Sequence, residues 1–367
     1  MSLRIGILGT RGVPNHYGGF EQFAAYLSKT LASKGYEVFV YNTHDHPFKE
    51  NTWNDVRLIK CYDPSNKMGS AGQFIYDLNC VIDARKRKFD ILLILGYTSS
   101  SVWGKLYPRD AVIVTNMDGL EWKRSKYPPI VQRFLRYAEK LAIRFSNRHI
   151  ADAVPIQEYL FRKYDVLADY ISYGAEIPVT VDESLLSKYG LEKNQYFLLI
   201  ARMEPENMIE TILTGVHTFY PDRKVLVAGN VQNRFGRKMV EKFAMNPNII
   251  FAGAIYDRDV LHSLRTYCSA YFHGHSVGGT NPSLLEAMAC GALICAHDNE
   301  FNRSVLGDDA FYFSDENDIA RLDEWATRSN ANEMVLANLQ KIRERHSWEK
   351  IVSEYEALFL DVQRKKK

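Results

Sequence analysis

A glycine-rich stretch from His273 to Gly291 carries the residues best suited to chemistry. Its sequence, HGHSVGGTNPSLLEAMACG, indicates the end of a buried strand, a loop and a helix. Backbone N–H groups in such a loop can hold phosphate and sugar oxygens. We expect Glu286 in the first turn of the helix, where a carboxylate suits the helix dipole and can accept two hydrogen bonds from a ribose diol. The run Gly278-Gly-Thr-Asn-Pro282 has no evident packing role, so we interpret its glycine and polar residues, with the adjoining Ser283, as ligand-binding: Gly278, Gly279, Thr280, Asn281 and Ser283.

A second candidate is Arg202, in the segment Ala201–Asn207 that follows a predicted strand. A guanidinium group can bind two phosphate oxygens at once. The alternative is a surface loop whose Pro-Glu pair simply begins a helix.

Two further candidates lie in the first half of the chain. Gly9 to Gly12 and the pair Gly18-Gly19 flank a predicted helix start, where a backbone free of Cβ atoms can approach an anion such as a diphosphate. The spacing differs from G-x-G-x-x-G, so ligand-free turns of this kind remain an alternative. Asp118 and Glu121 follow another strand, where catalytic groups gather, although Asp-Gly is also a common turn pair.

Alternating strands and helices position these candidates. In the first half we expect strands at 4–9, 37–41, 91–95 and 112–115, with a helix from Gly18-Gly19 to about Gly35. The pattern restarts near residue 196 with strands at 196–201, 224–228, 249–252, 270–273 and 293–297, separated by helices at 206–219, 235–244, 260–268 and 283–289. Short apolar strands alternating with helices predict parallel α/β sheets, which bind ligands at the carboxyl ends of their strands. The fold class is therefore α/β, with two Rossmann-like domains facing across a cleft.

Length and local composition place the domain boundaries. A chain of 367 residues suits two domains, with Gly174 and Pro178 marking a hinge between them. We expect an N-terminal domain at 1–174, a C-terminal domain at 175–347, and a helix at 348–367 that packs back on the N-terminal domain.

Charge and cysteine usage restrict the class of protein. Residues 1–175 carry 24 Lys and Arg against 17 Asp and Glu, whereas the rest carry 22 against 27. A basic first half suggests an anionic partner there, and an acidic second half disfavours nucleic acid. The odd set of cysteines has no C-x-x-C pair, so we expect reduced thiols and no zinc site: Cys61, Cys80, Cys268, Cys290 and Cys295. The short apolar run at 3–8 indicates neither a signal peptide nor a membrane span.

The stretch 123–148 combines eight basic residues with the single acid Glu139. Apolar residues recur at helical spacing, and we expect them in the core: Val131, Phe134, Leu135, Ala138, Leu141, Ala142 and Phe145. The outer face would then be basic and could meet an anionic membrane.

Two short patterns have simpler explanations. Asp257-Arg-Asp259 could suggest a metal–nucleotide site, but it precedes a helix, so capping is the better interpretation. His44-Asp-His46 could bind a metal, but a loop fits as well, and we predict no metal.

At these residues the chain resembles the retaining glycosyltransferases of family 4, which have the glycosyltransferase B fold. Three segments are similar to a bacterial rhamnosyltransferase subfamily that builds capsule, exopolysaccharide or O-antigen units: Asn15–Glu21, Ala201–Asn207 and His273–Gly291.

The resemblance implies roles for individual residues. Arg202 would bind the donor diphosphate, Glu286 the ribose, and Gly18 and Gly19 would lie beside the donor phosphates. His16, Glu21 and Glu121 would line the acceptor side. Three positions depart from the family pattern: Asn207 replaces a lysine, Gly278 the first glutamate of Glu-x7-Glu, and Asp118 a histidine. Rhamnose lacks a 6-hydroxyl group, so altered sugar contacts would suit it.

The resemblance implies transfer of a sugar, with retention, to a saccharide or lipid-linked saccharide acceptor. The donor would be dTDP-rhamnose or a UDP or GDP sugar, no cofactor or metal is required, and catalysis would use Asp118, Arg202 and Glu286. We expect a cytoplasmic protein that meets the inner face of the cell membrane. Two alternatives stay open: a catalytically degenerate nucleotide-sugar-binding scaffold, and a sugar-nucleotide epimerase on the same fold.

Overall fold

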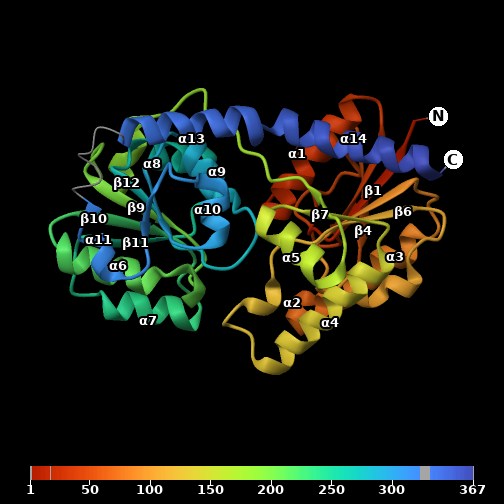
Figure 1. Cartoon of the computed structure of the whole chain (residues 1–367), viewed down its shortest axis with the longest axis horizontal. Helices are drawn as coiled ribbons and strands as arrows, with labels where there is room; N and C mark the ends of the chain where they lie inside the picture. The colour runs from red at the N-terminus through yellow and green to blue at the C-terminus, as the bar shows by residue number, and fades with distance from the viewer. Residues whose placement is uncertain (1, 17, 323–330, 367) are drawn as a thin grey trace. The chain divides into compact units, whose positions relative to one another are not determined.

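The computed structural model describes residues 2–16, 18–322 and 331–366, which form two compact units (Figure 1). Unit 1 comprises Met1–Lys123, Tyr127–Tyr173 and Trp348–Lys367, and unit 2 comprises Arg124–Lys126 and Gly174–Ser347. The short segment Arg124–Lys126 is thus part of unit 2, although the chain on either side of it belongs to unit 1. No sequence pattern predicts that these three residues belong to unit 2.

Unit 1 is built on an eight-stranded sheet in the order β3-β4-β2-β1-β5-β6-β7-β8, parallel except for the β3–β4 pair. Its strands are β1 (Arg4–Leu8), β2 (Glu37–Thr43), β3 (Thr52–Trp53), β4 (Val56–Cys61), β5 (Ile91–Leu95), β6 (Val112–Asn116), β7 (Arg148–Ala151) and β8 (Asp169–Tyr170). The strand order reverses between β1 and β5. Loops leaving those two strands therefore splay apart and leave room for a ligand.

The helices of unit 1 are α1 (Gly19–Ser33), α2 (Ser65–Met68), α3 (Ser70–Ala84), α4 (Pro129–Phe145), α5 (Val154–Tyr164) and α14 (Trp348–Lys366). Figure 1 shows the C-terminal α14 alongside α1. Trp348 stacks on Tyr26 with 4.3 Å between ring centroids, and Tyr355 contacts Phe23 at 5.0 Å. These aromatic contacts tie the C-terminal helix to unit 1.

One expectation for α4 is wrong in part. Leu135, Ala138 and Ala142 are buried, but Phe134 is 36% exposed instead of lying in the core. The helix also ends at Phe145, and Arg148 begins β7. The lone acid Glu139 is 1% exposed and faces inward.

Unit 2 has a six-stranded, wholly parallel sheet in the order β11-β10-β9-β12-β13-β14. Its strands are β9 (Tyr196–Ile200), β10 (Lys224–Ala228), β11 (Ile249–Gly253), β12 (Ala270–His273), β13 (Ile294–His297) and β14 (Phe311–Phe313). Its helices are α6 (Ile209–Phe219), α7 (Arg234–Lys242), α8 (Arg258–Tyr267), α9 (Pro282–Ala289), α10 (Glu300–Leu306), α11 (Glu316–Ile319) and α13 (Ala331–Arg345). The order reverses between β9 and β12, the strands that precede Arg202 and the glycine-rich loop.

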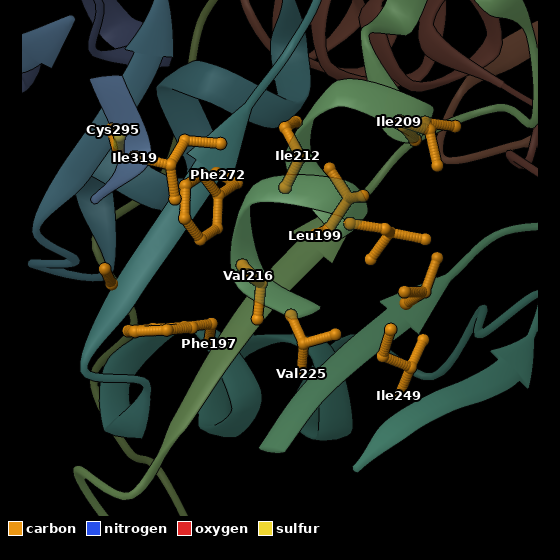
Figure 2. Packing of buried hydrophobic residues seen from close by; sticks show 14 of the residues in the cluster. Phe197, Leu199, Ile209, Ile212, Val216, Val225, Ile249, Phe272, Cys295 and Ile319 are labelled. Carbon is orange, nitrogen blue, oxygen red and sulfur yellow. The ribbon is translucent and has the colours of Figure 1, made fainter. Parts of the chain in front are cut away.

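An apolar core holds this sheet against α6. Figure 2 shows Phe197 and Leu199 of β9 beside Ile212 and Val216 of α6, with Phe272 of β12 nearby. All five are at most 3% exposed. Burying side chains of this size stabilises the fold by about 1.5–3 kcal/mol each, so the strand ends that carry the candidate residues are firmly placed.

The helix expected at 206–219 begins later, at Ile209. Pro205–Asn207 form a separate 3₁₀ turn, and Met208 adopts a left-handed conformation with φ of 50°. A proline readily starts a turn, but a left-handed residue cannot continue a right-handed helix.

Other local predictions can be checked directly. The Asp257 side chain accepts hydrogen bonds from the N–H groups of Asp259 and Val260, which confirms its capping role. His44 and His46 lie in a loop, where each accepts a backbone N–H. The five cysteines are free and buried. None of the helices in the described ranges is both long and apolar enough to cross a membrane.

Candidate active site

Arg202 lies in the loop after β9, on a turn that two side-chain hydrogen bonds stabilise. The Asn207 side chain, 3% exposed, donates a hydrogen bond of 2.7 Å to the Arg202 carbonyl oxygen. Asn233 donates to the neighbouring Met203 carbonyl oxygen at 2.6 Å. The Arg202 side chain itself is exposed. Asn207, predicted to bind the donor, therefore stabilises the turn that carries Arg202.

The glycine-rich loop after β12 is bonded to that turn. Ser276 donates to the Glu206 carbonyl oxygen through both its N–H (3.1 Å) and its hydroxyl (2.7 Å). Gly274 packs so closely that a Cβ atom there would lie 2.1 Å from the Asn207 carbonyl oxygen, so any larger residue would force the loops apart. The two segments singled out in the sequence thus form one surface at the strand switch of unit 2.

Side-chain contacts restrict the glycine-rich loop more than its glycine content suggests. The Asn281 side chain caps α9 by accepting the Ser283 N–H at 2.9 Å, and Thr280 is 3% exposed. The expectation that this run lacks a packing role is therefore wrong for these two residues. Gly278 differs, because its φ of 144° favours glycine and the space around its missing Cβ is open. Gly279, beside it, is half-buried.

Glu286 lies in the second turn of α9, not the first, because the helix begins at Pro282. Its Oε2 atom is 2.5 Å from Nη2 of Arg265 on α8, whose side chain is 3% exposed against 23% for Glu286. The same guanidinium contacts the Ser283 hydroxyl at 3.3 Å, and Tyr271 contacts that hydroxyl at 2.8 Å. The Glu286 carboxylate is thus held by a buried cation, and the exposed part of its side chain is open to a ligand.

Sequence reasoning missed Arg265. It lies on an amphipathic helix among other charges, and its inward direction depends on how α8 packs against α9. The only available signal was a basic residue in the last turn of a predicted helix.

Two more cations belong to unit 2. The Arg124 guanidinium lies 3.9 Å from a Glu206 carboxylate oxygen, and the Lys126 amine lies 3.8 Å from a Glu204 oxygen. Burial lowers the pKa of Lys126, and the nearby positive charge of Arg202 lowers it further. Arg202 and Arg124 are near enough to Lys126 for their charges to lower its pKa, and cations that repel one another favour an anion that can bridge them. The sequence had placed both residues only in a basic stretch.

Two histidines lie at the start of the glycine-rich loop, where β12 ends. The rings of His273 and His275 stack with centroids 4.5 Å apart. Burial, with His297 nearby, lowers the pKa of His273 to about 3, and burial also lowers the pKa of His275. Both imidazoles are therefore neutral at physiological pH and add no charge to the start of the loop.

The N-terminal candidates surround the loop after β1 in unit 1. Glu21 is 4% exposed and accepts hydrogen bonds from the Thr10 hydroxyl (3.1 Å) and the Arg11 N–H (2.8 Å). Gly18 precedes α1 in an extended conformation, and exposed Gly19 is the first residue of that helix. His16 is exposed and contacts the His46 ring edge-on at 4.3 Å. Glu21 thus holds the loop, whereas His16 and Gly19 face solvent.

Asp118 follows β6 on an anchored turn of unit 1. Its φ is 50°, and its N–H donates to the Asn116 side chain at 2.9 Å. Asn116 in turn donates to the Tyr355 hydroxyl of α14 at 3.2 Å. Glu121 follows in a 3₁₀ turn at Glu121–Lys123. Both carboxylates are half-buried at the carboxyl edge of the sheet, as expected for residues after a strand.

Within residues 2–16, 18–322 and 331–366, no group of three or more His, Cys, Asp or Glu side chains is arranged to hold a metal ion. Three positive side chains at the Arg202 turn of unit 2 could bind an anion: Arg202, Arg124 and Lys126.

Two known families match the chain, one on each side of a point near the boundary of the two units at Tyr173 and Gly174. Residues 3–176 match the family described as "Domain of unknown function (DUF1972)", and residues 182–340 match glycosyl transferases group 1. No curated protein matches the sequence.

Solved structures share the fold over nearly the whole chain. Sucrose-phosphate synthase from Thermosynechococcus elongatus is 16% identical with a TM-score of 0.81, covering 98% of this chain and 99% of that one. Anabaena Alr3699/HepE, solved with UDP and glucose, is 14% identical with a TM-score of 0.76 and the same coverage. Trehalose 6-phosphate synthase from Burkholderia multivorans is 12% identical with a TM-score of 0.72, covering 100% and 98%. The chain is therefore a group 1 glycosyltransferase with the glycosyltransferase B fold and an N-terminal DUF1972 domain, and it transfers a sugar from a nucleotide-sugar donor.

Proposed function

We propose that the chain transfers rhamnose from dTDP-rhamnose, with retention, to a lipid-linked saccharide during synthesis of capsule, exopolysaccharide or O-antigen. The observation that supports this donor site is that hydrogen bonds join the Arg202 turn to the glycine-rich loop. The two segments follow β9 and β12, the strands between which the strand order of unit 2 reverses. Ligands of open parallel sheets bind at such switches.

In this proposal Glu286 binds the nucleoside sugar ring. Its carboxylate accepts hydrogen bonds from hydroxyl groups of the ribose. Arg265 donates to Oε2 and so fixes the orientation of the carboxylate. In the 2′-deoxyribose of dTDP only the 3′-hydroxyl remains to donate. Anabaena Alr3699/HepE was also solved with UDP-glucose, so UDP sugars, like GDP sugars, belong in any donor screen.

The diphosphate lies against the Arg202 guanidinium and the backbone N–H groups at Gly279 and Thr280. Arg124 and Lys126 add positive charge on the same unit. Fixed cations stabilise a departing diphosphate without reorganising during the reaction, so no metal is needed.

One position favours a 6-deoxy sugar. Gly278 has open space where a side chain could have contacted sugar hydroxyl groups. The other departure in unit 2, Asn207, concerns the diphosphate, because its side chain is bonded to the Arg202 carbonyl oxygen and supplies no charge. A site with fewer polar contacts loses least when the sugar lacks its 6-hydroxyl group.

The transfer breaks the bond between the anomeric carbon and the diphosphate oxygen, and forms a bond from that carbon to the acceptor oxygen on the same face. The acceptor proton passes to the departing phosphate oxygen. Asp118 steadies positive charge on the sugar or orients the acceptor, and His16, Glu21 and Glu121 lie on the acceptor side, with Glu21 acting through the loop it holds.

Mass spectrometry of a panel of nucleotide sugars with short lipid-linked acceptors tests the proposal. We expect dTDP-rhamnose to give a product one deoxyhexose heavier, with retained configuration by NMR. Arg202→Ala and Glu286→Ala should each lower kcat/KM at least about 100-fold, because both remove charge-assisted contacts to the donor. The exposed Glu241→Ala on α7 is the matched control and should stay near the wild-type rate.

Each other outcome has a defined meaning. Donor binding without transfer to any acceptor would indicate a scaffold, and epimer formation without acceptor would indicate an epimerase. Near-normal turnover in both site variants would overturn the assignment of the donor site.

A further inference from the structure

Helix α4, yellow in Figure 1, presents two different kinds of surface to solvent. The first is an apolar strip formed by Ile130, Phe134 and Tyr137, which are 75%, 36% and 57% exposed. These residues are spaced i, i+4 and i+7, so they lie on one face of the helix. The second is a basic band of four exposed residues: Arg133, Arg136, Lys140 and Arg144.

The opposite face of α4 is already covered by unit 1. Leu135, Ala138 and Ala142 are buried there, and the Ser101 hydroxyl donates to the Ala138 carbonyl oxygen at 2.8 Å. The apolar strip is therefore additional to the core face. It continues onto α3, because the Phe74 ring lies 5.6 Å from that of Phe134.

The exposed part of α4 carries positive charge only. Its single acid, Glu139, is 1% exposed, and one of its oxygens lies 2.9 Å from the Lys163 amine. A solvent-facing apolar strip beside a row of cations is complementary to an anionic lipid surface, where acyl chains meet phosphate groups. Nucleic acid would match the cations but would gain nothing from exposed isoleucine.

We propose that α4 lies in the interface of an anionic bilayer, with the apolar strip inserted between headgroups and the basic band on the lipid phosphates. This deepens the proposed function by naming the surface that would bring the enzyme to a lipid-linked acceptor. Long basic side chains can reach the phosphates while an apolar strip is immersed.

Co-sedimentation of the full-length protein with vesicles tests the surface. We expect binding to mixed phosphatidylglycerol–phosphatidylcholine vesicles, no binding to phosphatidylcholine alone, and weaker binding at high salt. Arg133→Gln with Lys140→Gln should weaken binding about 30-fold. Ile130→Ser with Tyr137→Ser should weaken it about tenfold, because apolar area no longer leaves water.

The matched control is Arg343→Gln with Arg345→Gln, which removes the same charge from exposed positions on α13. It should bind vesicles as the wild type does, and thermal unfolding should show that all three double variants fold. Equal losses in the control and the α4 charge variant would overturn the proposal, since binding would then depend only on total charge.

Three other results would also overturn it: no wild-type binding to anionic vesicles, unchanged binding in both α4 variants, or dimerisation in solution that the strip variant abolishes. A second readout separates this proposal from the proposed function. The strip variant should keep wild-type transfer to a water-soluble acceptor and lose it to the same acceptor in vesicles. No wild-type transfer to either acceptor would overturn the proposed function, whereas vesicle binding would still decide the role of α4.

Discussion

Two helix-borne carboxylates, one in each unit, differ in how completely the protein surrounds them. Glu139 of α4 is 1% exposed and accepts hydrogen bonds from four side chains: Trp122, Tyr159, Lys163 and Tyr164. The Glu286 side chain is 23% exposed, and Arg265 holds its Oε2. A carboxylate has about four lone-pair positions. Glu139 uses them for the fold, whereas the exposed part of Glu286 can meet a ligand.

The comparison shows why residue type alone misleads. Both acids have a basic partner on a neighbouring helix, Lys163 on α5 or Arg265 on α8. For Glu286 the buried partner is the cation, so the carboxylate reaches the surface. For Glu139 the carboxylate is buried and the cation is 32% exposed. In each ion pair, the partner that is more exposed is the one that a ligand can contact.

The largest expected effect is on stability. Glu139→Ala should lower the free energy of unfolding by about 3–5 kcal/mol, because it leaves three aromatic donors without their acceptor and removes the buried partner of the partly exposed Lys163. Chemical denaturation monitored by tryptophan fluorescence measures this. The exposed Glu158→Ala on α5 should change stability by less than about 0.5 kcal/mol. A small loss for Glu139→Ala would remove the distinction between the two carboxylates.

The second-largest expected effect is on the donor KM when Glu286 loses its ion-pair partner, Arg265. Arg265→Met should raise the donor KM about tenfold or more, because an unfixed carboxylate must be ordered on binding. Arg265→Lys should recover part of the loss. Inhibition by inorganic pyrophosphate, which has no ribose, should stay unchanged in both variants. If pyrophosphate inhibition falls in parallel, Arg265 supports the whole loop and is not a positioning residue for Glu286.

The smallest effect concerns pH. Burial and Arg202 lower the pKa of Lys126, so its ammonium form is lost at a lower pH than that of an ordinary lysine. Because only the charged form attracts a diphosphate, UDP affinity should fall several-fold as the pH rises through that lowered pKa. A bound diphosphate should in turn favour proton uptake. Isothermal calorimetry across alkaline pH measures the decline, and Lys126→Met should remove it. The same alkaline decline in Lys126→Met would assign it to another group.

Most of unit 2 could be predicted locally. Strands β10 and β12 have the expected bounds, and β9 and β13 differ by one residue, because each is a short apolar run between turn residues. The start of α6 could not be predicted, since a left-handed conformation at a methionine, here Met208, has no signal in the local sequence. In unit 1 the sequence did not indicate β4, whose apolar run is interrupted by the exposed Arg57 and Lys60, or β7, which begins at the end of a basic stretch.

The sequence by itself determined the fold class, two α/β units, and the segments that meet at the strand switch of unit 2. These follow from apolar periodicity and from glycines, which act over a few residues. Only the tertiary structure decided that Arg265 lies beneath Glu286, that Arg124 and Lys126 belong to unit 2, and that Phe134 faces solvent while Glu139 does not. Burial and charge pairing depend on which distant helix lies opposite a side chain, and no local pattern encodes that.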